Sequence, residues 1–234
     1  MHLEQYFTPS QAEFSFTRNQ ACSFAKQIAN DFNPIHDEDA TRFCVPGDLL
    51  FAVALSKLGL SEKMDIRFSD MVSDGVNLHF EHASDGHVDI QDEAGKNYLY
   101  IKSEGKKNLD ADMISKLTEV YVAFSGKTFP HLLVPLWEAN EVMVNPARPL
   151  VIYESMHLEL DTLDFHNPTL EYAHSSLEVN GKRGNACIRF NFKEGNDTLG
   201  HGEKRIVLSG LKPYDQKAID GLIEFYNERK SIFA

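Results

Sequence analysis

The sequence predicts an α+β protein whose chain has two similarly built halves. Hydrophobic periodicity changes from helical spacing to strand-like alternation twice along the chain. Each half reads as a helix, a second apolar helix and four strands, and a polar stretch near residue 108 separates them. We therefore expect two domains, residues 1–108 and residues 109–234.

The first half contains one helix with apolar residues on nearly every side. This helix is expected from about Asp48 to Leu58, and such a pattern is typical of a buried helix. A shorter helix precedes it and stops near Asn30, because Pro34 disfavours a helical conformation in the residue before it. The expected strands of this half are 64–69, 76–81, 87–91 and 98–102.

The second half repeats this order without repeating the residues. A helix is expected at 111–125, and a second apolar segment follows at 129–137. Asn180-Gly181 is a strong hairpin signal between two expected strands. An amphipathic helix closes the chain at 215–230. The expected strands are 150–160, 169–179, 185–192 and 203–208.

Composition and charge narrow the range of partners. The 234 residues are 42% hydrophobic and 25% charged, which is ordinary for a globular protein. A formal net charge of −12 argues against nucleic acid as a partner. No apolar run is long enough to span a membrane and no signal peptide is recognisable, so we expect a cytoplasmic protein without a membrane partner. The three cysteines are scattered and form no Cys-x-x-Cys, so we expect neither disulfides nor a metal site.

The segment between the first two helices carries the residues best suited to catalysis. Its core is Asp31-x-Asn33-Pro34-x-His36. An unbroken helix would point Asp31 and His36 in different directions, whereas an Asn-Pro turn can fold the two side chains together. A carboxylate beside an imidazole forms a general acid/base pair that can hold and polarise one water molecule. We therefore predict Asp31 and His36 as catalytic residues.

Gly47 precedes the buried helix and is the predicted contact for a ligand carbonyl. The N-terminus of a helix presents unpaired N–H groups and the positive end of its dipole. Glycine permits a ligand to approach the backbone closely, so these N–H groups can stabilise an enolate oxygen. Asp164-Phe-His-Asn-Pro168 partly echoes the first motif, but its order differs and we expect it to be an inter-strand turn.

Residues 25–55 resemble the hydratase-2 motif of the MaoC-like, (R)-specific enoyl-CoA hydratases. The matching positions are Asp31, Asn33, Pro34, Ile35, His36, Ala40 and Gly47. The resemblance implies a double hot-dog fold: two antiparallel sheets, each wrapped around a buried helix. It also implies that Asp31 and His36 activate the water that adds to an enoyl thioester, with Gly47 in the oxyanion hole.

The chain departs from that family at two positions. Ala29-Asn30 stands where the family usually has Ser/Thr-Gly, and Pro46-Gly47 stands where it usually has His-Gly. The motif also lies in the first half, whereas eukaryotic double hot-dog hydratases carry it in the second. Taken whole, the chain also resembles an uncharacterised bacterial family of unknown function.

The sequence therefore predicts a hydratase or dehydratase acting on an acyl thioester, either trans-2-enoyl-CoA or its acyl-carrier-protein equivalent. Asn33 and Gly47 are predicted to bind substrate, and the acyl chain is predicted to run along the buried helix beside Leu50, Phe51 and Ala54. No cofactor is expected beyond the CoA or phosphopantetheine of the substrate. Three alternatives stay open: an acyl-CoA or lipid-like ligand bound without turnover, a thioesterase-like hydrolase in which Cys44 would be the nucleophile, and a purely structural or regulatory partner protein. The protein is expected to be a monomer with internal pairing of its halves or a homodimer.

Overall fold

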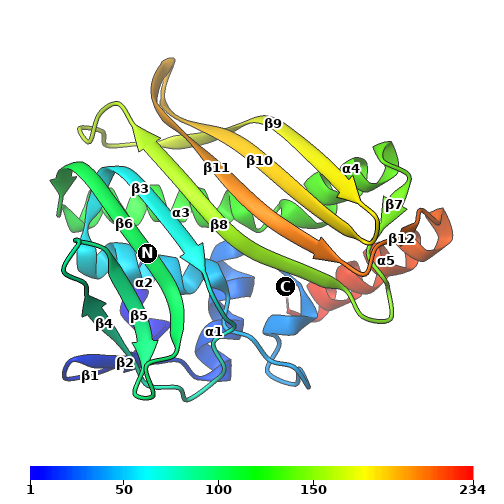
Figure 1. Cartoon of the computed structure of the whole chain (residues 1–234), viewed down its shortest axis with the longest axis horizontal. Coiled ribbons are helices and arrows are strands. Elements are labelled where there is room, and N and C mark those ends of the chain that lie inside the picture. The colour runs from blue at the N-terminus through cyan, green and yellow to red at the C-terminus, as the bar shows by residue number, and fades with distance from the viewer. Residues whose placement is uncertain (234) are drawn as a thin grey trace.

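The computed structural model describes residues 1–233, which form one large antiparallel sheet with helices packed behind it (Figure 1). Ten strands follow the order β1-β2-β4-β5-β6-β3-β8-β11-β10-β9. They are β1 (Thr8–Ser10), β2 (Glu13–Ser15), β3 (Leu60–Phe68), β4 (Leu78–His82), β5 (Val88–Asp92), β6 (Asn97–Asn108), β8 (Leu150–Leu160), β9 (Thr169–Asn180), β10 (Arg183–Glu194) and β11 (Asp197–Ser209). A separate pair joins β7 (Val142–Met143) to β12 (Lys212–Pro213).

The sheets of the two halves join through β3 and β8. These strands pair antiparallel, with Ile66 opposite Met156. The fold is the predicted double hot dog, and its two sheets are the two halves of one continuous sheet. The shared edge uses the free backbone groups of both sheets, which would otherwise be open to pairing with another chain.

Helices of both halves lie against the same side of the sheet (Figure 1). The long helices are α2 (Gly47–Leu58), α3 (Ala111–Ser125) and α5 (Gln216–Phe233), and the shorter ones are α1 (Arg18–Phe24) and α4 (Leu133–Ala139). Short helical turns are η1 (Leu3–Gln5), η2 (Ala25–Ala29), η3 (Pro34–His36) and η4 (Thr128–Leu132). Helix α1 starts after Thr17, whose hydroxyl accepts from the Gln20 N–H in a capping box.

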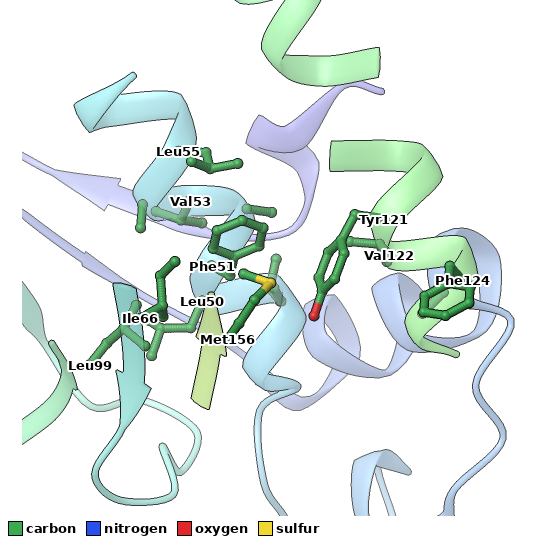
Figure 2. Close-up of a cluster of buried hydrophobic side chains, with 14 of the residues drawn as sticks. Leu50, Phe51, Val53, Leu55, Ile66, Leu99, Tyr121, Val122, Phe124 and Met156 are labelled. Atoms are coloured by element: carbon green, nitrogen blue, oxygen red, sulfur yellow. The ribbon is translucent and has the colours of Figure 1, made fainter. Parts of the chain in front are cut away.

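The core lies between α2, α3 and the sheet. Every residue of α2 from Leu49 to Leu55 is buried, as the all-round apolar pattern predicted. Phe51 meets Tyr121 of α3 edge to face with ring centroids 5.4 Å apart, and Met156 of β8 lies beside them (Figure 2). Each such side chain contributes roughly 1.5–3 kcal/mol through burial. Because side chains of both halves pack together in this cluster, the two halves share one core.

Most predicted elements are present, with differences at their ends. The helix at 111–125 and the strand at 150–160 have the expected limits. Strands β3 and β11 begin earlier than their alternation indicated, at Leu60 and Asp197. The alternation missed β1, β7 and β12, which have only two or three residues each. Within residues 1–233, no helix is both long and apolar enough to cross a membrane.

Candidate functional site

The Asp31–His36 segment leaves helix η2 through a left-handed residue. Asn30 has φ 52°, and the Asp31 N–H closes the helix on the Ala25 carbonyl at 2.8 Å. Asn33 then caps η3, its side-chain oxygen accepting from the Ile35 N–H at 3.2 Å. Pro34 fits the first position of this turn, where no N–H is needed. The turn reverses the chain so that residues 31 and 36 face each other.

Asp31 and His36 lie close together at the surface of this turn. The distance from Asp31 Oδ2 to His36 Nε2 is 3.8 Å, and the two side chains are 27% and 13% exposed. His36 Nδ1 lies 2.7 Å from the Cys44 carbonyl oxygen, which can only accept, so Nδ1 carries the proton. In neutral His36, Nε2 is therefore an acceptor, like Asp31 Oδ2. Two acceptors at this distance are suited to share the two O–H groups of one water molecule.

The remaining predicted site residues lie at the start and in the body of α2. A side chain at Gly47 would come within 3.0 Å of Phe68 and 3.4 Å of Tyr153, so only glycine fits there without displacing an aromatic ring. Leu50, Phe51 and Ala54 are 2%, 1% and 1% exposed and belong to the core. Asn33 uses its side-chain oxygen within the turn. The substrate contacts of these residues stay predictions.

Buried, charged side chains hold the turn in place. Lys26 and Asp37 are paired at 2.8 Å with side chains 5% and 1% exposed. Arg229 of α5 also pairs with Asp37. Lys26 Nζ donates in addition to the Asp31 carbonyl at 3.0 Å. The backbone on both sides of the predicted catalytic pair is thus tied to one buried carboxylate.

Helix α5 closes over the same turn from the far end of the chain. The Tyr226 hydroxyl donates to the Asn30 carbonyl at 3.3 Å and accepts from the Phe32 N–H at 3.4 Å. Phe32 and Tyr226 also pack edge to face. Burial raises the pKa of Tyr226 to about 12, so the hydroxyl keeps its proton through the physiological range. A segment of the second half therefore helps to fix the motif of the first.

The C-terminus of α3 packs directly against the backbone before the turn, because Gly126 has no side chain to separate them. A Cβ atom placed on Gly126 would lie 1.8 Å from the Ala29 carbonyl oxygen, which is a severe clash. Only glycine allows this approach. It brings Ser125, the last residue of α3, next to the segment that carries Asp31.

A second polar cluster, formed by Asp48, Ser125 and Lys204, has no motif in the sequence that predicts it. Ser125 Oγ donates to Asp48 Oδ2 at 2.5 Å and accepts from Lys204 Nζ at 2.5 Å. Burial raises the pKa of Asp48 and lowers that of Lys204. Asp31 and His36 both influence the Asp48 carboxyl electrostatically, so this cluster lies within range of the predicted catalytic pair.

Two tyrosines flank this cluster. The hydroxyls of Tyr121 and Tyr153 are hydrogen-bonded to each other, and Lys204 Nζ lies 4.0 Å from the centre of the Tyr153 ring. Tyr121 also faces Asp48 and Ser125. Burial raises the pKa of both phenols, so both remain neutral. Four of the five residues, all but Asp48, lie in strands or helices of the second half that carry no recognisable motif.

The Cys44 thiol lacks the environment of a nucleophile. Its Sγ donates to the Val45 carbonyl at 3.2 Å, and burial raises its pKa to about 12. A reactive cysteine needs a lowered pKa, because the thiolate is the attacking species. Cys44 contributes instead through its backbone, whose carbonyl fixes the proton on His36. Among residues 1–233, no three His, Cys, Asp or Glu side chains are arranged to hold a metal ion.

Comparison with known families identifies the chain. Residues 1–217 match the family described as "Protein of unknown function (DUF3581)". The chain belongs to this family. The match includes the Asp31–His36 turn and the Asp48–Ser125–Lys204 cluster and ends near the start of α5. No curated protein has a detectably similar sequence.

Several solved structures share the overall arrangement at very low sequence identity. A tesB protein of Mycobacterium avium subspecies paratuberculosis aligns with a TM-score of 0.50 and 10% identity, covering 88% of this chain and 97% of that one. A protein of unknown function with a hot-dog fold from Alicyclobacillus acidocaldarius gives 0.48 and 7%, covering 92% and 99%. A MaoC-like dehydratase gives 0.44 and 9%, covering 89% and 99%. These similarities concern the fold, and the neighbours include both thioesterases and a dehydratase.

Proposed function

We propose that the protein adds water to the double bond of a 2-enoyl thioester, or removes water in the reverse direction. The observation that carries this proposal is the 3.8 Å approach of Asp31 Oδ2 to His36 Nε2, with the tautomer of His36 fixed by the Cys44 carbonyl. Both atoms are acceptors at a partly exposed position. Together they suit a single water molecule held for general base catalysis.

The chemistry requires one proton to leave water and one to reach carbon. The Asp31–His36 pair removes a proton from the bound water as its oxygen forms a bond to C3 of the enoyl chain. The electrons of the double bond move toward the thioester oxygen, where the N–H at Gly47 stabilises the enolate. The pair then returns the proton to C2. Atoms and charge balance without a redox or metal cofactor, and CoA or phosphopantetheine arrives as part of the substrate.

The position of the motif also supports an acyl thioester as substrate. The positions that match the hydratase-2 motif run from Asp31 to Gly47 and lead directly into the buried helix α2. An acyl chain directed along α2 would pass Leu50, Phe51 and Ala54. Because these residues are tightly packed, entry of a chain requires the core beside α2 to open. A short or branched acyl group needs less opening than a long one.

The direct test measures hydration of a panel of trans-2-enoyl-CoA substrates of increasing chain length. We expect turnover by the wild type and a loss of roughly 10²–10⁴-fold in Asp31→Asn, the range that general base catalysis supplies. Asp164→Asn is a matched control, because Asp164 lies with His166 in an exposed turn. Folding of each variant is checked by circular dichroism.

Three outcomes would overturn the proposal. Wild-type turnover that survives Asp31→Asn would place the chemistry elsewhere. Loss in the Asp164→Asn control equal to that in Asp31→Asn would show a nonspecific effect. Binding of acyl-CoA without turnover at any chain length would favour a non-catalytic binding protein.

A further inference from the structure

The Asp48–Ser125–Lys204 cluster places a hydroxyl between a buried carboxyl group and a buried amine. Ser125 and Lys204 are 3% and 5% exposed. Asp48 Oδ1 is also buried, and within residues 1–233 it has no hydrogen-bond partner. Asp48 and Gly47 as whole residues are half-buried, although the Asp48 carboxyl oxygen Oδ1 is buried. The cluster therefore lies at the partly exposed N-terminal end of α2.

Packing alone does not explain this arrangement. A buried ion pair must repay a desolvation cost, and apolar residues of similar size often give equal or greater stability. An unpaired buried oxygen such as Asp48 Oδ1 adds a further cost. Groups of this kind are common where chemistry needs them, and a nucleophile within hydrogen-bond reach of a base is the usual arrangement for covalent catalysis.

We propose that Ser125 is an acyl-accepting nucleophile and that Asp48 and Lys204 exchange its proton during cleavage of a thioester. This activity is separate from the proposed hydration and uses different residues. It assigns a hydrolytic site to Ser125 and Lys204 of the second half, completed by Asp48 at the start of α2.

The two steps balance as an ordinary acyl transfer. Ser125 Oγ passes its proton to Asp48 and forms a bond to the acyl carbon, and the carbon–sulfur bond breaks. Lys204 protonates the departing thiolate. Water then attacks the Ser125 ester and gives one proton to Lys204, and Asp48 returns its proton to Ser125 as the free acid leaves. The sum is thioester plus water giving acid plus thiol.

The geometry separates this proposal from a purely structural bridge. Ser125 Oγ donates to Asp48 and accepts from Lys204, so the base for the hydroxyl proton and the acid for the leaving group both contact the nucleophile. The Tyr121 hydroxyl, which is hydrogen-bonded to that of Tyr153, flanks the same cluster. A bridge needed only for stability would not react with an electrophile.

The experiment treats the folded full-length protein with a fluorophosphonate and, separately, with acetyl-, octanoyl- and palmitoyl-CoA followed by acid quenching. Adducts are mapped by mass spectrometry. We expect phosphonylation at Ser125, an acyl adduct at the same residue with at least one acyl-CoA, and release of free CoA. Lys204→Met should slow phosphonylation by roughly 10²-fold or more, the lower range of acid–base assistance. Ser125→Ala should give no adduct at this position, and Ser61→Ala is its matched control, because Ser61 is also buried, at 1% exposure.

The outcomes distinguish this proposal from the hydration proposal. Asp31→Asn should still give the Ser125 adduct although it loses hydration, because no hydrogen bond joins Asp31 to Ser125. Absence of any Ser125 adduct in the wild type would overturn the inference, and so would an adduct at another residue only or an unchanged rate in Lys204→Met. Adduct mapping on the wild type requires no variant, so a folding defect in Ser125→Ala would leave the test decisive.

Discussion

The two halves of the chain use their helix junctions differently. In the first half, residues 30–46 separate η2 from α2 and carry Asp31 on irregular backbone and His36 at the end of the one-turn helix η3. In the second half, only Gly126 and Lys127 separate α3 from η4. The polar residues contributed there, Ser125 and Lys204, lie at a helix end and on a strand. One half therefore presents its chemistry on a loop and the other on regular elements.

This difference determines which other residues must hold each set of polar side chains in position. A loop has few backbone hydrogen bonds of its own, so its side chains must be held by other parts of the molecule. Lys26, Arg229 and Tyr226 supply that support to the Asp31–His36 turn. Ser125 and Lys204 are placed directly by α3 and β11. Substitutions of Lys26, Arg229 or Tyr226 should therefore affect the Asp31–His36 turn more than the Asp48–Ser125–Lys204 cluster.

The largest expected effect on stability comes from Asp37→Ala. Removing this carboxylate leaves Lys26 buried without its ion-pair partner, and breaking such a buried pair typically costs about 3–5 kcal/mol. Urea denaturation measures the change in the free energy of unfolding. Lys116→Ala is the comparison, because its pair with Asp112 is exposed and should have little effect. Equal effects of the two substitutions would show that the buried ions do not support the turn.

Gly126→Ala should have the next largest effect. The added methyl group would overlap the Ala29 carbonyl, and forced overpacking of this kind costs roughly 1–3 kcal/mol. Gly221→Ala is the matched control in α5, where a methyl group meets nothing within 4 Å. That control should gain about 0.5–1 kcal/mol from helix propensity. Thermal unfolding of the pair gives the comparison, and a stabilised Gly126→Ala would contradict the close approach.

Tyr226→Phe should have a smaller effect that depends on pH. Loss of the hydroxyl removes a modest hydrogen bond worth about 0.5–1.5 kcal/mol. Because the pKa of Tyr226 rises from 10.0 to about 12 on folding, the wild type has this stabilisation in full below pH 10 and loses it as pH approaches 12. The difference in unfolding free energy between wild type and variant should therefore shrink over that interval. A difference that stays constant would show that the hydroxyl is not protected by burial.

The fold could be predicted from the sequence because its main elements are strongly patterned. The continuous apolar stretch of α2 and the alternation of β8 and β10 both reflect burial on one or both faces. The join between β3 and β8 leaves no such trace, since strand pairing depends on backbone groups that every residue has. Strands of two or three residues are too short to show alternation.

The candidate site was predictable only where its residues are close in sequence. Asp31 and His36 are joined by an Asn-Pro turn with a known local geometry. Ser125 and Lys204 are 79 residues apart, and their contact depends on tertiary packing. One signal was present in the sequence: Lys204 shares the alternation of Ile206 and Leu208 and therefore faces the core. A charged residue at an inward strand position indicates a buried partner.

The most direct measurement of the central claim is a double-mutant cycle on hydration turnover. Asp31→Asn, His36→Gln and the double variant are compared with wild type on the best enoyl-CoA of the panel. If both residues activate one water molecule, each single variant loses roughly 10²–10⁴-fold in kcat and the double variant loses no more than the poorer single variant. Losses that multiply in the double variant, or wild-type turnover in either single variant, would contradict a shared water at this turn.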